Sequence, residues 1–171
     1  MTKEKSTKSA AHPSTESADK EELSEGFHRY YKAVYQSDEN VSAVLNCHLV
    51  AEYYMEQIIM ASLPRGDILF SGKNKPGFGS KLQLLQALDV AEDELITSLR
   101  SLNQVRNSCS HELDYQITRN DIEKIGRSWG KQHIETRREC GDDTNKFLRW
   151  TLMAPLARLE TIFEDLIEKD S

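Results

Sequence analysis

Residues 95–111, with the sequence LITSLRSLNQVRNSCSH, decide the fold class of this 171-residue chain. Apolar side chains recur in this stretch every three or four positions, which is the spacing of one face of an α-helix. At about 100° per residue these side chains fall within an arc of roughly 120°. The members of this apolar stripe are Leu95, Leu99, Leu102, Val105 and Cys109. The stretch therefore predicts an amphipathic helix that ends near His111.

The segments on both sides show the same helical periodicity. We expect further helices over residues 19–37, 40–63, 81–88, 120–130 and 144–169. Pro64 and Gly66 end the second of these helices, and Ser80 caps the third. Pro155 lies inside the last helix, where we expect it to cause a kink.

Two polar segments, residues 72–80 and 131–143, are predicted to be exposed loops because they combine glycine with other residues typical of turns. No segment alternates apolar and polar residues as a half-buried strand does, and no internal repeat is visible. Residues 1–18 lack hydrophobic periodicity and have the composition of a disordered tail. We therefore expect one all-α, single-domain helical bundle over residues 19–171.

The composition limits the classes of partner. The chain has a net charge of −6 and 29% charged residues. An acidic chain disfavours a broad nucleic-acid surface, so we expect no DNA binding, although a local cleft for RNA remains allowed. The three cysteines form no C-x-x-C pair, which argues against a disulfide framework or a zinc cage. With no signal peptide or membrane-length apolar run, we expect a cytoplasmic protein without membrane contact.

Arg106 is the most unusual residue of the deciding stretch, because its position falls inside the apolar stripe. An unpaired guanidinium is costly to bury, so Arg106 must meet a carboxylate, line a solvated cleft or face a second subunit. His111, five residues further on, points about 140° away from Arg106 on a regular helix. One straight helix cannot aim both side chains at one substrate, so convergence needs a helix end or a second chain.

His48 and Glu52 form a second anomaly, four residues apart within the apolar stripe of the predicted helix 40–63. Three interpretations are open. His48 and Glu52 satisfy each other, or Glu52 pairs with Arg106 and locks two helices together, or the pair supports catalysis directly.

Arg106, Asn107 and His111, at the end of a helix, resemble the motif of the HEPN superfamily, in which an Arg followed by a polar residue precedes a His. The likeness extends over about residues 40–125. It includes the long helix, the glycine-rich loop, the short helix that follows and the downstream residues 115–118. HEPN proteins are typically dimeric helical bundles, so the resemblance implies a two-fold homodimer.

In catalytic HEPN proteins, the Arg and His of both protomers line a cleft that cleaves RNA without a metal ion. Carried over to this chain, the resemblance makes His111 the general acid or base, since an imidazole titrates near neutral pH. Arg106 would hold the phosphate, and Asn107 would orient the pair or the substrate. The implied function is a metal-independent, cofactor-free endoribonuclease of toxin or defence type, with RNA as substrate and an antitoxin as a further partner.

The chain is also similar to the mannitol operon repressor family. That family has a comparable Arg and His run, followed by a Tyr-x-x-Thr-like stretch before an acidic helix start; Tyr115 and Thr118 are the corresponding residues here. This second resemblance implies a non-catalytic dimeric regulator that acts through protein contacts. A ribonuclease, a regulator and a structural helical domain in which the motif occurs by chance are therefore all open at the level of the sequence.

Overall fold

A computed structural model gives the structure of the protein and describes residues 31–37, 39–112 and 114–169. In chain order, the elements are η1 (Tyr31–Tyr35), α2 (Asn40–Ser62), α3 (Asp67–Phe70), α4 (Phe78–Ala87), α5 (Asp93–His111), α6 (Arg119–Gly126), η2 (Arg127–Trp129), α7 (Lys131–Cys140) and α8 (Thr144–Lys169). All of these elements are helical, and the described residues contain no strand. The predicted all-α class is confirmed.

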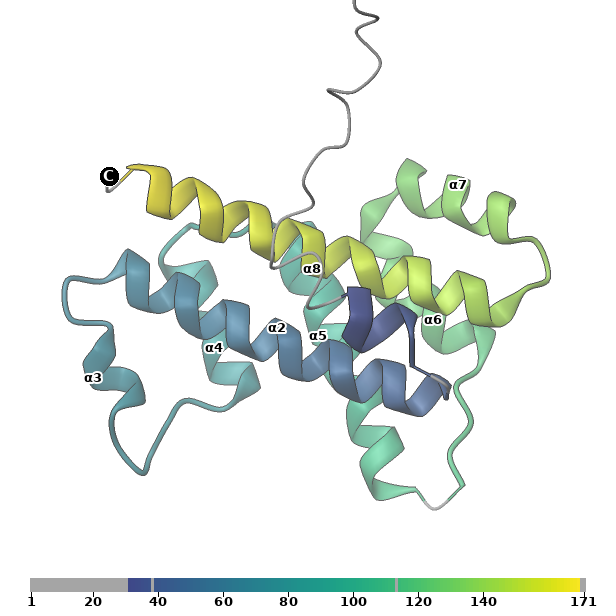
Figure 1. Ribbon diagram of the computed structural model, residues 1–171, viewed down its shortest axis with the longest axis horizontal. Helices are drawn as coiled ribbons and strands as arrows, with labels where there is room; N and C mark the ends of the chain where they lie inside the picture. Colours follow the sequence, from purple (N-terminus) through teal and green to yellow (C-terminus); the bar gives the residue numbers. More distant parts are fainter. Residues whose placement is uncertain (1–30, 38, 113, 170–171) are drawn as a thin grey trace, which may run out of the picture.

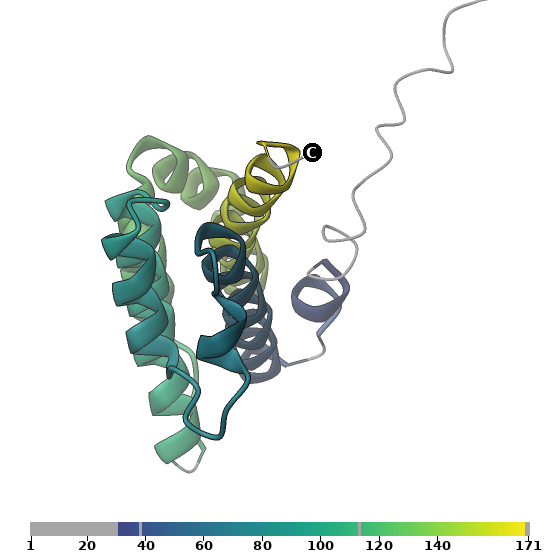
Figure 2. The same cartoon turned by 90° about the vertical axis from the view of Figure 1, so that its left-hand side faces the viewer.

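The two long helices, α2 and α8, pack along each other and form the centre of the fold (Figure 1). Turning the molecule by 90° shows η1 on one side of this pair and α4 and α5 on the other (Figure 2). α6 packs on both α5 and α8, and α7 packs on α8. No helix within the described ranges has both the length and the apolarity that a membrane crossing requires.

The apolar stripe of the deciding stretch is part of the core. Leu95, Leu99 and Leu102 are fully inaccessible to solvent, and Val105 is nearly so. They meet fully buried side chains of α2 and α8, such as Met55 and Leu152. The burial of this continuous apolar surface is the dominant stabilising contribution to such a bundle.

The prediction of an exposed loop over residues 131–143 is wrong, because most of this segment is helix α7. Gly130 and Gly141 flank α7 with φ angles of 56° and 53°, a left-handed conformation that glycine adopts readily. α7 buries His133 and Cys140, which lie on one face. Because the buried positions hold His and Cys in place of aliphatic residues, apolar periodicity did not reveal the helix.

The segment before α4 also differs from the prediction. The short helix α3 lies just before the predicted loop, and α4 begins at Phe78 after an extended Gly77. Ser80 is therefore inside the first turn and does not cap the helix. The ring of Phe78 stacks on His48 of α2, with centroids 4.1 Å apart, and this contact fixes the start of α4.

The remaining boundaries agree closely with expectation. α2, α5, α6 and α8 cover the predicted helices to within a few residues, and Pro155 is buried within α8. Of the predicted helix 19–37, residues 31–35 form the π-helix η1, whereas residues 19–30 and the predicted tail 1–18 lie outside the described residues.

Candidate functional site

Arg106 lies on the second-last turn of α5 and is half-buried. Its Nη1 donates a hydrogen bond to Oδ1 of the neighbouring Asn107, at 3.3 Å. Within residues 31–37, 39–112 and 114–169, Arg106 forms no ion pair with a carboxylate. A guanidinium in this position keeps most of its donors available for an anion from outside the chain.

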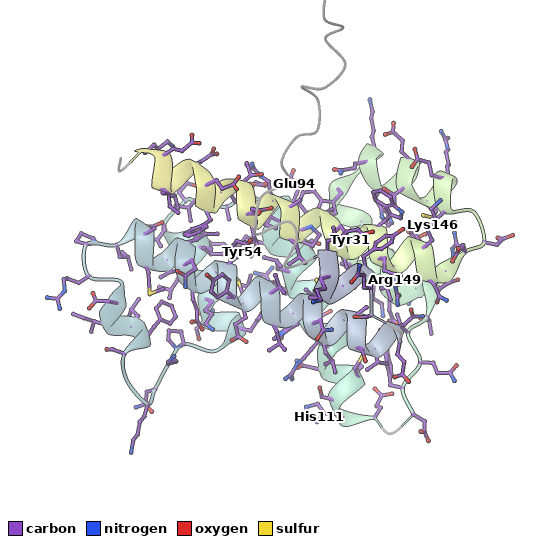
Figure 3. All side chains as sticks on the ribbon, viewed as in Figure 1. Tyr31, Tyr54, Glu94, His111, Lys146 and Arg149 are labelled. Carbon is purple, nitrogen blue, oxygen red and sulfur yellow. The ribbon has the colours of Figure 1, made fainter. Side chains whose placement is uncertain are left out.

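His111 is the last residue of α5 and is exposed. It lies where α5 extends beyond the body of the bundle, away from the α2–α8 pair (Figure 3). α5 is continuous from Asp93 to His111, so the separation of about 140° between Arg106 and His111 applies to the folded chain. The structure therefore does not bring Arg106 and His111 of one chain together.

The turn after His111 is anchored by Tyr115 and α6. A capping box joins Thr118 and Asp121: the Thr118 backbone N–H and hydroxyl donate to Oδ2 of Asp121, at 2.9 and 2.6 Å. Burial, together with a hydrogen bond from its hydroxyl to Asp121, raises the pKa of Tyr115 to about 12. Tyr115 also interacts with Ser108 of α5. These contacts fix the end of α5 that carries His111.

Glu52 belongs to an ion-pair cluster between α2 and α4. Nζ of Lys81, whose side chain is only 2% exposed, lies 2.6 Å from Oε1 of Glu52 and 2.6 Å from Oε1 of Glu56. The ion pair between Glu52 and Arg106, one of the three interpretations open from the sequence, is not formed, because Lys81 provides the cation for Glu52. Sequence analysis missed Lys81, which occupies a core-facing position of an amphipathic helix and could have been found by the same helix arithmetic that singled out Arg106.

His48 forms its hydrogen bond with Asn103 and not with Glu52, the partner considered from the sequence. Its Nε2 lies 3.0 Å from Oδ1 of Asn103 on α5, and no direct bond to Glu52 is formed. Burial lowers the pKa of His48, and the positive charges of Arg106 and Lys81 lower it further, against the opposing effects of Asn103 and Glu52. His48 is thus a buried, neutral imidazole close to Arg106 at pH 7, with Asn103 as the residue that sequence analysis missed.

An exposed apolar strip on α2 lies beside this region. Leu49 is 63% exposed and Tyr53 is 41% exposed, which is high for large apolar side chains. Around α2, Leu49 lies about 100° from His48, the residue that contacts α5. The strip is therefore a solvent-facing side of α2, distinct from the side that His48 turns toward α5.

The described ranges contain no group of three or more His, Cys, Asp or Glu side chains that could hold a metal ion. The chain matches no protein-family model, and comparison with curated proteins and with solved structures gives no match. Function must therefore be argued from the site itself.

Proposed function

We propose that the protein is a metal-independent endoribonuclease of toxin or defence type, with an HEPN-like site that two copies of the chain form together. The observation that carries the proposal is Arg106, a half-buried guanidinium without a carboxylate partner among the described residues. Lys81 pairs with Glu52, the acid considered as a partner for Arg106 from the sequence, and so leaves Arg106 available for a phosphate.

Dimer formation is supported by the positions of three side chains. His111 is exposed at the protruding end of α5 and cannot reach the substrate of its own Arg106. Leu49 and Tyr53 offer exposed apolar area on α2 that a second copy would bury. In a two-fold dimer, Arg106 of one protomer faces a substrate held near the partner copy's imidazole.

The chemistry follows from these groups. One imidazole accepts the proton of the ribose 2′-hydroxyl, whose oxygen attacks the phosphorus, and the bond to the 5′-oxygen breaks. A water molecule gives a proton to that leaving oxygen, so each composite site uses one Arg106 and the imidazole of the other copy. Arg106 neutralises the charge that develops on the phosphoryl oxygens, and Asn107 holds the guanidinium. The products are a 2′,3′-cyclic phosphate and a 5′-hydroxyl end.

The direct test incubates the full-length protein with labelled RNA in EDTA. We expect cleavage by the wild type, a loss of at least about a hundredfold with His111→Ala or Arg106→Ala, and no cleavage of the 2′-deoxy substrate. Arg100→Ala is the matched control, because Arg100 is an exposed arginine on the same helix. Cleavage that His111→Ala leaves unchanged would refute the proposal.

A mixing experiment tests the two-copy site. Arg106→Ala and His111→Ala are each inactive alone, but a heterodimer of the two contains one Arg106 and one His111 on opposite protomers. If the pair acts across the interface, an equimolar mixture after subunit exchange recovers a substantial part of the activity. A mixture as inactive as its components would exclude this arrangement.

The alternative function is a non-catalytic dimeric regulator of the mannitol repressor type, acting on a regulatory partner protein. The exposed Leu49 and Tyr53 and the net charge of −6 support protein contact more than RNA contact. Under this alternative, His111→Ala keeps the cellular phenotype, whereas Leu49→Glu abolishes it.

A further inference from the structure

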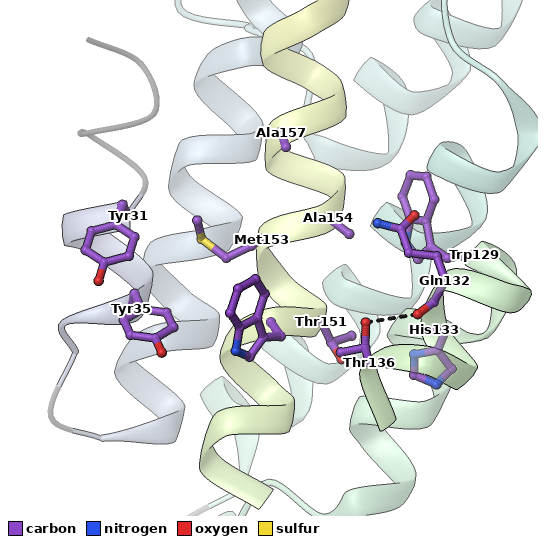
Figure 4. A pocket seen from close by; sticks show the side chains of 11 residues that line it. Tyr31, Tyr35, Trp129, Gln132, His133, Thr136, Thr151, Met153, Ala154 and Ala157 are labelled. Atoms are coloured by element: carbon purple, nitrogen blue, oxygen red, sulfur yellow. Dashed lines mark hydrogen bonds between the residues drawn. The ribbon is translucent and has the colours of Figure 1, made fainter. Parts of the chain in front are cut away.

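A cavity of about 430 Å³ lies between η1, α7 and α8, away from Arg106. Its volume is within the range of small-molecule sites in proteins. Figure 4 shows η1 on one side of the exposed part of α8, and η2 with α7 on the other (Figure 4). None of its lining residues belongs to the Arg106 region.

Aromatic side chains form one wall of this cavity. The rings of Tyr31 and Tyr35 stack with centroids 4.9 Å apart, and the ring of Tyr35 meets Trp150 edge-on at 6.3 Å. Ala154 and Ala157 lie between the aromatic wall and α7, and their small side chains leave the space open. Trp150 is 50% exposed, an unusual state for the largest apolar side chain. Flat, apolar walls of this kind favour a flat, apolar ligand.

The hydroxyl of Thr151 is a buried polar group of the cavity lining that has no partner. Thr151 is only 3% exposed, lines the cavity, and its Oγ1 has no hydrogen-bond partner. A buried hydroxyl without a partner is unfavourable and rare in folded proteins. Thr136, across the cavity, already donates its own hydroxyl to the carbonyl of Gln132, at 2.9 Å. Because the Oγ1 atom itself is almost inaccessible, a rotation about χ1 that turns the hydroxyl into the cavity would let a bound molecule with one donor or acceptor satisfy Thr151.

The lining also determines the charge of the ligand. None of the lining residues is Asp, Glu, Lys or Arg. His133 is the one titratable imidazole among them, and its Nε2 is taken by Oε2 of Glu123, at 2.8 Å. No lining side chain can therefore neutralise a charged ligand, which would lose its hydration without compensation.

We propose that this cavity binds a neutral, flat, largely apolar small molecule that forms a hydrogen bond with the Thr151 hydroxyl. The site is independent of the proposed nuclease site, because it shares no residue with it. It fits aromatic or heteroaromatic molecules with a single polar group, held between the Tyr35 and Trp150 rings and α7.

The probe is N-phenyl-1-naphthylamine, a neutral aromatic amine that fluoresces in apolar surroundings and has one N–H donor. Trp129 and Trp150, the chain's two tryptophans, both line the cavity, so binding also quenches the intrinsic fluorescence of the full-length protein. We expect saturable binding of one probe per chain. The anionic relative 8-anilinonaphthalene-1-sulfonate should bind at least about tenfold more weakly because its sulfonate finds no cation.

Two variants and one control variant show where the probe binds. Ala157→Leu fills the cavity and should weaken probe binding at least about tenfold, whereas Thr161→Leu, an exposed site one turn further along α8, should leave it unchanged. Thr151→Val should weaken binding and keep or raise the Tm, since it removes a buried hydroxyl without a partner. Thermal melts show that each variant is folded.

Four results would overturn the proposal. The first three are no saturable signal with the full-length wild type, equal affinity for the neutral and anionic probes, and binding that Ala157→Leu does not change. Probe binding that is lost as the protein is concentrated would assign the cavity to a second copy of the chain, and would also overturn it.

Discussion

Lys81→Met is expected to be the most destabilising single change of a charged side chain at the α2–α4 contact. Nζ of Lys81 is 2.6 Å from carboxylate oxygens of both Glu52 and Glu56, and the lysine side chain is only 2% exposed. Methionine nearly preserves the apolar stem but removes the charge, which leaves two carboxylates facing each other. Breaking a buried ion pair in this way costs about 3–5 kcal/mol of unfolding free energy.

The expected cost is smaller than that range because the two carboxylates keep some water. Glu52 and Glu56 are 30% and 23% exposed, so part of their hydration is recovered. We expect a loss of about 2–4 kcal/mol, measured by urea unfolding followed by circular dichroism. The corresponding fall in Tm is roughly 5–15 °C for a chain of this size.

Lys124→Met is the matched control, because Lys124 also pairs with a carboxylate, Asp121, at 3.4 Å, but has a side chain that is 49% exposed. Because Lys124 is half-exposed and Asp121 keeps its hydrogen bonds from Thr118, this pair should contribute only about 0–1 kcal/mol. Adding Glu52→Gln and Glu56→Gln to Lys81→Met should restore part of the lost stability by removing the repulsion. If the unfolding free energy of Lys81→Met differs from that of the wild type by less than about 0.5 kcal/mol, the cluster of Lys81, Glu52 and Glu56 does not stabilise the fold.

Three further predictions concern pH and association. Burial would raise the pKa of Asp121, but the hydrogen bonds from Thr118 outweigh this effect and hold the pKa below its usual range. The ionised Asp121 therefore stabilises the fold above about pH 4, and this stabilisation is lost as the pH falls further. Thr118→Ala should cost about 1 kcal/mol at pH 7 by urea unfolding and weaken this acid sensitivity, and an unchanged acid profile would contradict the assignment. Because burial lowers the pKa of His48, the imidazole binds a proton more readily in the unfolded chain, so stability should fall as the pH drops below about 6.5. His48→Gln should therefore make the urea midpoint less dependent on pH between pH 5 and 7.5. A variant whose midpoints change with pH as steeply as those of the wild type would contradict this role of His48. Leu49→Glu should turn a wild-type dimer into a monomer in light scattering while Gln104→Glu, an exposed site on α5, should not; a monomeric wild type would remove the two-copy site.

The helices of the core were predictable because their buried residues are aliphatic and recur with the helical period. α2, α5 and α8 bury Met55, Leu99 and Leu152 in this way, and the sequence pattern alone indicates them. α7 was not predictable by the same rule, since its buried residues are His133 and Cys140. Burial of the His133 ring is stabilised by stacking on Phe147, with ring centroids 5.3 Å apart, and by a hydrogen bond between its Nε2 and Glu123.

The sequence also indicated where polar side chains enter apolar faces, at Arg106, His48 and Glu52, but not their partners. Glu52 pairs with Lys81, which is 29 residues away in the chain, and His48 pairs with Asn103, which is 55 residues away. Each pair joins two different helices. Such pairs depend on which helices become neighbours and on how each is rotated, which periodicity within one helix does not specify.

The stretch of residues 95–111 thus determines by itself an amphipathic helix with Arg106 in its apolar stripe and His111 at its end. Local periodicity is sufficient for this, because backbone geometry sets the direction of each side chain around the helix axis. The tertiary structure alone decided that Leu102 is buried within the chain, that Leu49 is exposed, and that Arg106 meets no carboxylate within residues 31–37, 39–112 and 114–169. These outcomes depend on packing between distant segments, which brings Nζ of Lys81 on α4 to 2.6 Å from the Glu52 carboxylate.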